Sequence, residues 1–253
     1  MKIKISICYN GKNFVGWQTQ NNGRSVQEEI EKTLSFLFDE KTKIIGSGRT
    51  DAGVHALSQV ASFEISSNRF LKNFTLDSQL NSDKLINAIN ANLPSDIKIL
   101  SAEEIGDNFN ARFSAKQKTY LYRLQVGTNP LTDGFVGNVN LMPDIKAMKK
   151  ASKYLVGEHY FSSFCSSKTE TKTFVRKIYK IKIRKVSPIE FNFEITGNGF
   201  LYNMVRIIVG TLYEVGIGKK TVKDIKTILD SKDRKKAGKT LPASGLYLKQ
   251  VLY

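Results

Sequence analysis

A glycine-rich run between two short apolar segments constrains the fold of this chain more than any other feature. Residues 46–55 read GSGRTDAGVH, and residues 43–45 and 60–65 on either side read as strands. Glycine permits positive φ angles and a close approach of the backbone to other groups. We therefore expect a tight turn that holds Asp51 at a loop tip on a rigid scaffold, where reactive groups tend to lie.

The run does not match the common phosphate-binding loops. A dinucleotide-binding fingerprint would need glycine at position 51, and a P-loop would need Gly-Lys-Ser/Thr after four spacer residues. An isolated aspartate in a glycine loop is most often a solvated residue that stabilises its own turn. Asp51 therefore acquires a functional interpretation only from residues elsewhere in the chain.

The charge balance favours a polyanionic partner. The 253 residues include 39 Lys+Arg and 23 Asp+Glu, for a net charge of +16. Most of the basic residues are lysines, which suit phosphate groups better than planar base recognition. This charge is compatible with binding to nucleic acid or to an acidic protein. It is also compatible with a basic surface that serves only solubility.

Cysteine and histidine usage gives no sign of a metal site. Cys8 and Cys165 are far apart, and with His55 and His159 they show no metal-ligand spacing. Two free thiols are typical of a reducing compartment, so we expect a cytoplasmic protein.

No segment reads as a membrane span or a signal peptide. Residues 199–218 come closest to a span, but they include Asn203, Arg206 and Glu214. Residues 2–9, KIKISICY, read as an alternating strand and lack the apolar core of a signal peptide. We expect a soluble chain without membrane contact.

Strand and helix signals alternate in both halves. Ser25-Val-Gln-Glu28 forms a capping box that starts a helix, and Pro94 ends a short helix over residues 85–93. Residues 66–84 are polar and aperiodic, and we expect an exposed loop or insertion. Further strands are expected at 97–102, 118–126, 178–186, 191–196 and 246–252, with helices from Asp144 to about 156, within 199–218 and from Thr221. The pattern predicts an α+β fold of two units, residues 1–108 and 109–253, joined through one sheet.

Arg206 is the second unusual residue. It lies in residues 204–212, MVRIIVGTL, which are apolar on nearly every face of a helix. A helix of this kind is buried, so we expect the guanidinium to be buried too. A buried cation needs a partner, and Asp51 is the chemically sensible one, because the pair would keep the acid ionised. The alternative is an arginine that extends along its stem to the surface.

Tyr120 lies on the apolar face of its expected strand, in KTYLY at 118–122. Most such tyrosines are core residues with a hydrogen-bonded hydroxyl, although a ring stacked on a base is the alternative. His55 and His159 read as structural, since no Ser or Cys nucleophile motif accompanies them. The residues alone thus offer one carboxylate, which could be a nucleophile or a general base.

Several motifs occur in an order that one family shares. They are YNGKNFVGWQ at 9–18, SVQ at 25–27, GRTDAGVH at 48–55, NANLP at 90–94, FNARFS at 109–114, KTYLY at 118–122, GNGFLYNMVRIIVG at 197–210 and PASGLYL at 242–248. With these motifs the chain resembles the tRNA pseudouridine synthase A family nearly end to end. The chain departs from the family at Tyr160, where an aspartate is usual, and in the length of residues 66–84.

The resemblance assigns a role to five residues. Asp51 matches the catalytic aspartate, Tyr120 the tyrosine that packs against the target base, and Arg206 the arginine that forms a salt bridge to the aspartate. Arg49 matches an arginine proposed to flip or hold the nucleotide. Leu246 matches an apolar residue that lines the pocket.

The resemblance also implies an activity and a fold. Members isomerise uridine to pseudouridine in the anticodon stem-loop of tRNA, at positions 38, 39 and/or 40, as homodimers and without a cofactor. Their two related α/β subdomains share a continuous mixed, mostly antiparallel sheet with a central basic cleft. The remaining alternatives are a non-catalytic RNA-binding or RNA-folding protein and a pseudouridine synthase with a different RNA target.

Overall fold

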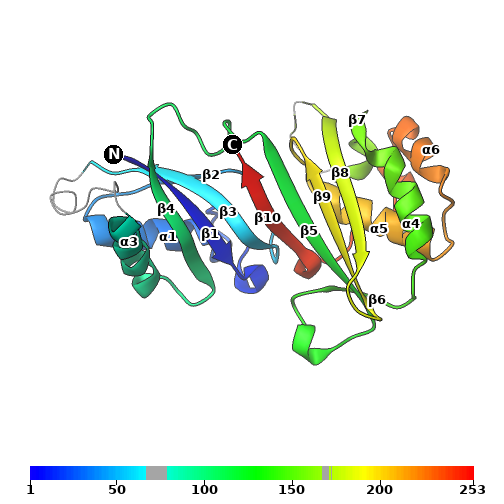
Figure 1. Cartoon of the computed structure of the whole chain (residues 1–253), viewed down its shortest axis with the longest axis horizontal. Helices are drawn as coiled ribbons and strands as arrows, with labels where there is room; N and C mark the ends of the chain where they lie inside the picture. Colours follow the sequence, from blue (N-terminus) through cyan, green and yellow to red (C-terminus); the bar gives the residue numbers. More distant parts are fainter. Residues whose placement is uncertain (67–78, 167–170, 172) are drawn as a thin grey trace. The chain divides into compact units, whose positions relative to one another are not determined.

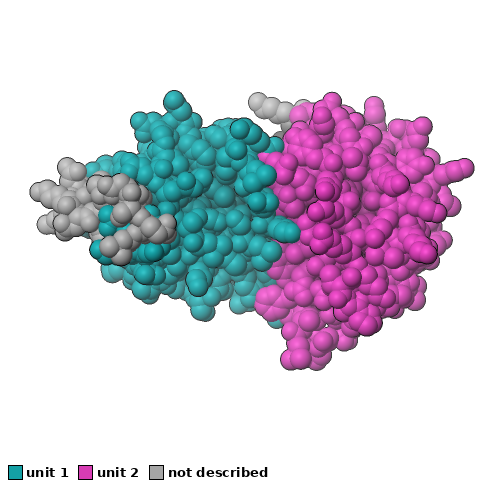
Figure 2. Space-filling model, in the orientation of Figure 1, with its two compact units in different colours: residues 1–116, 248–253 teal, residues 117–247 magenta. Residues whose placement is uncertain are grey.

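The computed structural model describes residues 1–66, 79–166, 171 and 173–253. They form two compact units, Met1–Lys116 with Leu248–Tyr253, and Gln117–Tyr247 (Figure 2). The end of the chain returns to the first unit, where the Lys116 amide donates to the Leu252 carbonyl at 2.8 Å and the Tyr253 hydroxyl donates to the Ala111 carbonyl at 2.9 Å. The first unit therefore includes the last six residues of the chain, whereas the sequence predicted a single boundary after residue 108.

Four strands lie wholly in the first unit, β1 (Lys2–Tyr9), β2 (Ile44–Gly46), β3 (His55–Glu64) and β4 (Ile97–Ile105), and most of β10 (Leu246–Leu252) belongs to it (Figure 1). Strand β1 lies between β3 and β4 and is antiparallel to both, and β2 pairs antiparallel with β3. Ile3, Ile5 and Ile7 are fully buried on one face of β1, as the alternation of side chains along a strand dictates.

In the described part of the first unit the helices are α1 (Val26–Phe38) and α3 (Gln79–Asn92). The predicted start of a helix at Ser25 is confirmed, because the Ser25 hydroxyl caps α1 by accepting from the Glu28 amide at 3.3 Å. The prediction of a loop over residues 66–84 is wrong for its last part, since α3 begins at Gln79. Leu85 and Ile89 lie one helical turn apart and are buried, so tertiary packing favours a helix longer than the polar sequence suggests. Residues 67–78 of that prediction lie outside the described chain.

The second unit contains β5 (Gln117–Val126), β6 (Gly137–Val139), β7 (Gly157–Tyr160), β8 (Val175–Lys185) and β9 (Glu190–Gly197). The strand order is β5-β9-β8-β7, antiparallel throughout, and β6 pairs parallel with β5. The α+β class with a mixed, mostly antiparallel sheet is thus confirmed. The cross-strand pairs Tyr122–Phe193 and Leu124–Phe191 are buried on one face of this sheet.

Three helices accompany these strands, α4 (Ile145–Ser152), α5 (Met204–Gly216) and α6 (Asp224–Ser231) (Figure 1). The Asp144 carboxylate caps α4 by accepting from the Lys146 amide at 2.7 Å, and a 3₁₀ turn extends the helix to Leu155. Other 3₁₀ turns span Gly11–Asn13, Pro130–Thr132, Ser162–Phe164, Arg234–Lys236 and Ala243–Gly245. Among the described residues no helix has the length and apolar character needed to cross a bilayer.

Candidate active site

The loop that carries Asp51 is fixed by the segment that precedes α1. Asp51 forms an isolated antiparallel bridge with Gly16, the Trp17 amide donates to the Thr50 carbonyl at 3.0 Å, and the Gly53 amide donates to the Phe14 carbonyl at 3.3 Å. Asp51 is half-buried. The sequence places it at a loop tip, and the structure adds that residues 14–17 hold the backbone of the loop.

Two glycines make this arrangement possible. Gly16 has φ +120°, and a Cβ at this position would lie 2.7 Å from the Thr50 carbonyl oxygen. Gly53 has φ +76°. Residues with a Cβ rarely adopt these angles, so the turn and its partner segment both depend on glycine.

Buried side chains add further support to the loop. The hydroxyls of Tyr9 and Thr50 are hydrogen-bonded at 2.7 Å, and Nδ1 of His55 accepts from the Gly11 amide at 3.0 Å. His55 is only 1% exposed, in agreement with its interpretation as a structural residue. No pattern in the sequence indicated a supporting role for Tyr9 or Thr50, although Tyr9 begins the first family motif and Thr50 lies inside the third.

Gln59 on β3 completes the support from the other side of the loop. Its Oε1 accepts from the Ser47 hydroxyl at 2.5 Å, and its Nε2 donates to the Gly48 carbonyl at 3.0 Å. No motif in the sequence indicated this residue. Arg49, which follows Gly48, is exposed and lies two residues before Asp51.

Arg206 lies in the first turn of α5, in the second unit. Its Nε donates to the Leu241 carbonyl at 2.6 Å and its Nη1 donates to Oδ1 of Asn203 at 2.7 Å. The residue is half-buried, whereas the apolar helix pattern predicted a buried guanidinium. The apolar pattern describes the body of the helix, whereas Arg206 is at the end, where the helix meets a loop.

Tyr120 and Leu246 also lie in the second unit. Tyr120 is half-buried on β5, and its ring meets Phe200 edge-on with centroids 5.1 Å apart. Leu246 begins β10 and is 6% exposed. Tyr122, two residues after Tyr120, donates its hydroxyl to the Pro242 carbonyl at 2.9 Å, and burial raises its pKa above the usual value.

The five predicted residues therefore fall into two sets. Arg49 and Asp51 belong to one loop of the first unit, and Tyr120, Arg206 and Leu246 belong to the second unit. Within the second unit, one loop of residues 198–203 contacts both Tyr120, through Phe200, and Arg206, through Asn203.

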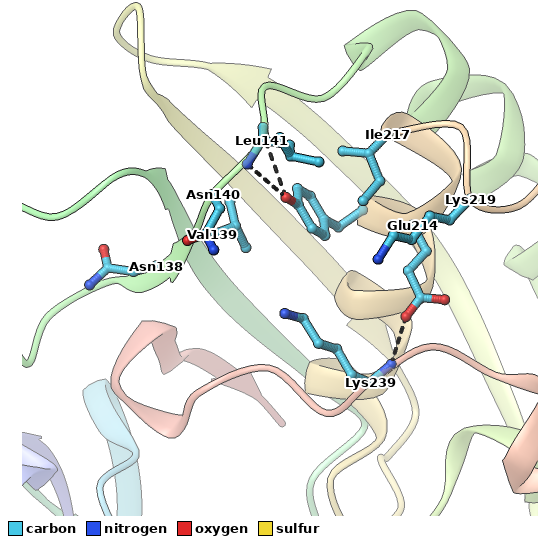
Figure 3. A pocket seen from close by; sticks show the side chains of 9 residues that line it. Asn138, Val139, Asn140, Leu141, Glu214, Ile217, Lys219 and Lys239 are labelled. Carbon is cyan, nitrogen blue, oxygen red and sulfur yellow. Dashed lines mark hydrogen bonds between the residues drawn. The ribbon is translucent and has the colours of Figure 1, made fainter.

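A separate pocket of about 190 Å³ in the second unit contains none of the predicted residues (Figure 3). Its wall includes Tyr213, whose hydroxyl bonds the Leu141 backbone, and Glu214, which accepts from the Lys239 amide at 3.0 Å. Lys220 pairs with the second oxygen of Glu214 at 3.4 Å. The pocket is lined by Asn138, Val139, Asn140, Leu141, Tyr213, Glu214, Ile217, Lys219 and Lys239.

Histidine, cysteine and carboxylate side chains do not gather as a metal centre in the part of the chain that the structure describes. The predicted positions supply a carboxylate, two guanidinium groups, a phenol and an apolar side chain. A carboxylate on a rigid loop can act as a nucleophile or as a base.

Comparisons with known proteins identify relatives along the whole chain. A family model described as tRNA pseudouridine synthase matches residues 5–114 and 151–253. Proteins named tRNA pseudouridine synthase A from Acetivibrio thermocellus and Caldicellulosiruptor bescii are 44% and 43% identical over 253 residues, covering 99% of this chain and 99% of each relative. A tRNA pseudouridine synthase A 2 from Bacillus anthracis is 41% identical over 251 residues, covering 98% of both chains.

Solved structures at low sequence identity also match. A crystal structure of a Cbf5-Nop10-Gar1 complex matches over 97% of this chain and 57% of its own, at 12% identity and a TM-score of 0.37. The full-length relatives and the family model are decisive. On their evidence, this chain belongs to the tRNA pseudouridine synthase family.

Proposed function

We propose that this chain isomerises uridine to pseudouridine in the anticodon stem-loop of tRNA, at positions 38, 39 and/or 40, with Asp51 as the catalytic carboxylate. Family membership makes the chain an isomerase that acts on tRNA. The observation that carries the role of Asp51 is its loop, whose backbone is bonded to residues 14–17 and whose side-chain supports are buried. A reacting group needs a preorganised position of this kind.

The reaction breaks the N1–C1′ glycosidic bond, turns the uracil and forms a C5–C1′ bond, after which the proton on C5 is lost. The C5 proton passes to solvent and N1 takes up a proton, so the isomerisation is redox-neutral and consumes no oxidant or reductant. The Asp51 carboxylate initiates the reaction by attack on C6 of the base, by attack on C1′ of the ribose, or by promoting loss of the C2′ proton. A stem uridine must first be flipped out of its stack, at a cost of a few kcal/mol.

Of the other four residues, one acts on the carboxylate and three contact the uridine in this proposal. Arg206 pairs with Asp51 and keeps it ionised, because a neighbouring positive charge lowers the pKa of a carboxyl group. Tyr120 stacks on the uracil and Leu246 lines its pocket. Arg49, whose exposed side chain lies next to the loop, contacts the flipped nucleotide.

The charge of the chain supports binding of tRNA. A net charge of +16 provides lysines for contacts with the phosphate backbone, and such contacts offset the cost of flipping. We further propose a homodimer, as in the family, and a cytoplasmic location, in keeping with the two free cysteines. Light scattering at micromolar concentrations tests the dimer, since a mass equal to one chain would contradict it.

The proposed function is tested by tritium release from tRNA transcripts labelled with [5-³H]uridine. We expect release by the wild-type protein and none by Asp51→Asn, with tRNA affinity nearly unchanged. Asp107→Asn, which removes another carboxylate of the first unit from an exposed position, serves as the control and should be fully active. Substantial turnover by Asp51→Asn would refute the role of Asp51.

Mapping of the modified positions completes the test. Pseudouridine at 38, 39 or 40 supports the proposed target, and pseudouridine only at other positions would assign a different RNA target. Binding of tRNA without any release would indicate a non-catalytic RNA-binding protein or an enzyme with a different RNA substrate.

A further inference from the structure

Asn203 precedes α5 in a backbone conformation that few residues adopt. Its φ of 61° and ψ of 6° lie in the left-handed region, which is unfavourable for residues with a Cβ, although asparagine tolerates it better than most. An asparagine at this N-cap position would ordinarily accept a hydrogen bond from a backbone amide of the first turn. The Asn203 side chain makes no such bond. The left-handed backbone and the absent capping bond both cost stability. Asn203 is therefore expected to serve a purpose other than capping the helix.

The side chain of Asn203 instead binds the arginine one turn later. Oδ1 of Asn203 accepts from Nη1 of Arg206 at 2.7 Å, while the Leu241 carbonyl accepts from Nε of Arg206 at 2.6 Å. Two acceptors on different nitrogens of a planar group fix both its position and its plane. The two bonds thereby orient the guanidinium that the proposed function pairs with Asp51.

The loop that carries Asn203 is itself anchored. At its start, the Lys177 amide on β8 donates to Oδ1 of Asn198 at 2.9 Å, and the Asn198 amide donates to the Lys177 carbonyl at 3.0 Å. In the middle, Phe200 meets the ring of Tyr120 edge-on. Asn203 therefore belongs to a loop that is fixed to the sheet and contacts two residues of the proposed site.

We propose that Asn203 is a positioning residue, which orients the Arg206 guanidinium for its ion pair with the catalytic carboxylate. The inference rests on the proposed function, because Arg206 acts on the carboxylate only in that scheme. The alternative, a purely structural role in starting α5, is at odds with the missing capping bond.

Asn203→Gly is the variant that separates the two roles. Glycine accepts the positive φ without strain, so the backbone is retained while the side-chain acceptor is removed. We expect the single-turnover rate of pseudouridine formation to fall about tenfold, because a hydrogen bond to a charged group is lost. The affinity for tRNA should stay within twofold of wild type.

The effect of Asn203→Gly is then measured again in an Arg206→Gln variant, which lacks the guanidinium. If Asn203 acts through Arg206, Asn203→Gly should change the rate less than twofold once the guanidinium is gone. An equal loss of rate in both backgrounds would overturn the proposal. So would a wild-type rate in Asn203→Gly alone.

A measurement independent of activity distinguishes this inference from the proposed function. ¹⁵N NMR reports rotation of the terminal guanidinium nitrogens of Arg206, with Arg206→Gln to assign the signal. We expect restricted rotation in the wild type and faster rotation in Asn203→Gly, with Nε–H still protected by Leu241. Identical rotation in both proteins would overturn the role of Asn203, whereas absence of pseudouridine formation by the wild type would refute only the proposed function.

Discussion

The hydroxyl groups of Tyr9 and Thr50 are hydrogen-bonded at 2.7 Å in the interior of the first unit. Tyr9 is the last residue of β1, and Thr50 immediately precedes Asp51. Their side chains are 3% and 7% exposed, so the bond is shielded from water. It links the central strand of the unit to the residue next to the proposed catalytic carboxylate.

Tyr9→Phe should lower both stability and turnover. The change removes this partner of a buried Thr50 hydroxyl, and a loss of about 1–2 kcal/mol in the free energy of unfolding is expected. Turnover should fall several-fold because the Asp51 loop loses a hydrogen bond that fixes it. The affinity for tRNA should be unchanged. Urea unfolding and tritium release measure the two effects.

Thr50→Val provides the control for the Tyr9 bond, since valine has nearly the shape of threonine. If the two hydroxyls stabilise each other, the double variant should lose less than the sum of the single variants, by about 1 kcal/mol. Strictly additive losses would contradict the interaction.

Gly16→Ala should destabilise the first unit strongly. The φ of Gly16 is +120°, and the added Cβ would lie 2.7 Å from the Thr50 carbonyl, so backbone must move. We expect a loss of more than about 2 kcal/mol and loss of turnover. Gly106→Ala in the same unit is the control, because a Cβ there meets nothing within 4 Å. Equal melting temperatures for the two variants would contradict this prediction.

His55 should tolerate asparagine better than leucine. The Gly11 amide donates to Nδ1 of His55 at 3.0 Å, and leucine would leave this buried donor without its acceptor, at a cost of about 1–3 kcal/mol. The side-chain oxygen of asparagine can occupy nearly the position of Nδ1. Thermal unfolding of His55→Leu and His55→Asn compares the two, and an equal loss in both would show that the acceptor is unimportant.

The parts of the fold that the sequence predicts correctly are those encoded locally. The helix start at Ser25 requires only four consecutive residues, and the buried face of β1 follows from alternating side chains. The first turns of α3 escape prediction because their sequence is polar. That helix is fixed from outside, where Asn90 exchanges two hydrogen bonds with the backbone of Ile99 on β4.

The same difference between local patterns and contacts of distant segments applies to the candidate site. The glycine run predicts a loop around Asp51, but its partner Gly16 lies far back in the chain and no local pattern connects the two. Arg206 is conspicuous in an apolar helix, yet its acceptor on Leu241 is 35 residues away. Hydrogen bonds between distant segments depend on the assembled fold, so sequence patterns indicate the reactive residues and miss the residues that hold them.

Stability should fall in alkaline solution, in part because of Tyr122. Burial raises the pKa of its phenol above the ordinary value of 10.0, although the charge of Arg206 opposes the shift. Above pH 10 the unfolded chain loses this proton while the native protein keeps it, so the free energy of unfolding falls by about 1.4 kcal/mol per pH unit for the group. Below pH 10 both states are protonated and the group contributes no pH dependence.

Tyr122→Phe loses the bond to Pro242 at every pH, but its stability should decline less steeply between pH 10 and 11.5 in urea titrations. Tyr179→Phe, with an exposed ring, is the control, and an unchanged slope in Tyr122→Phe would show that this phenol does not govern the alkaline loss.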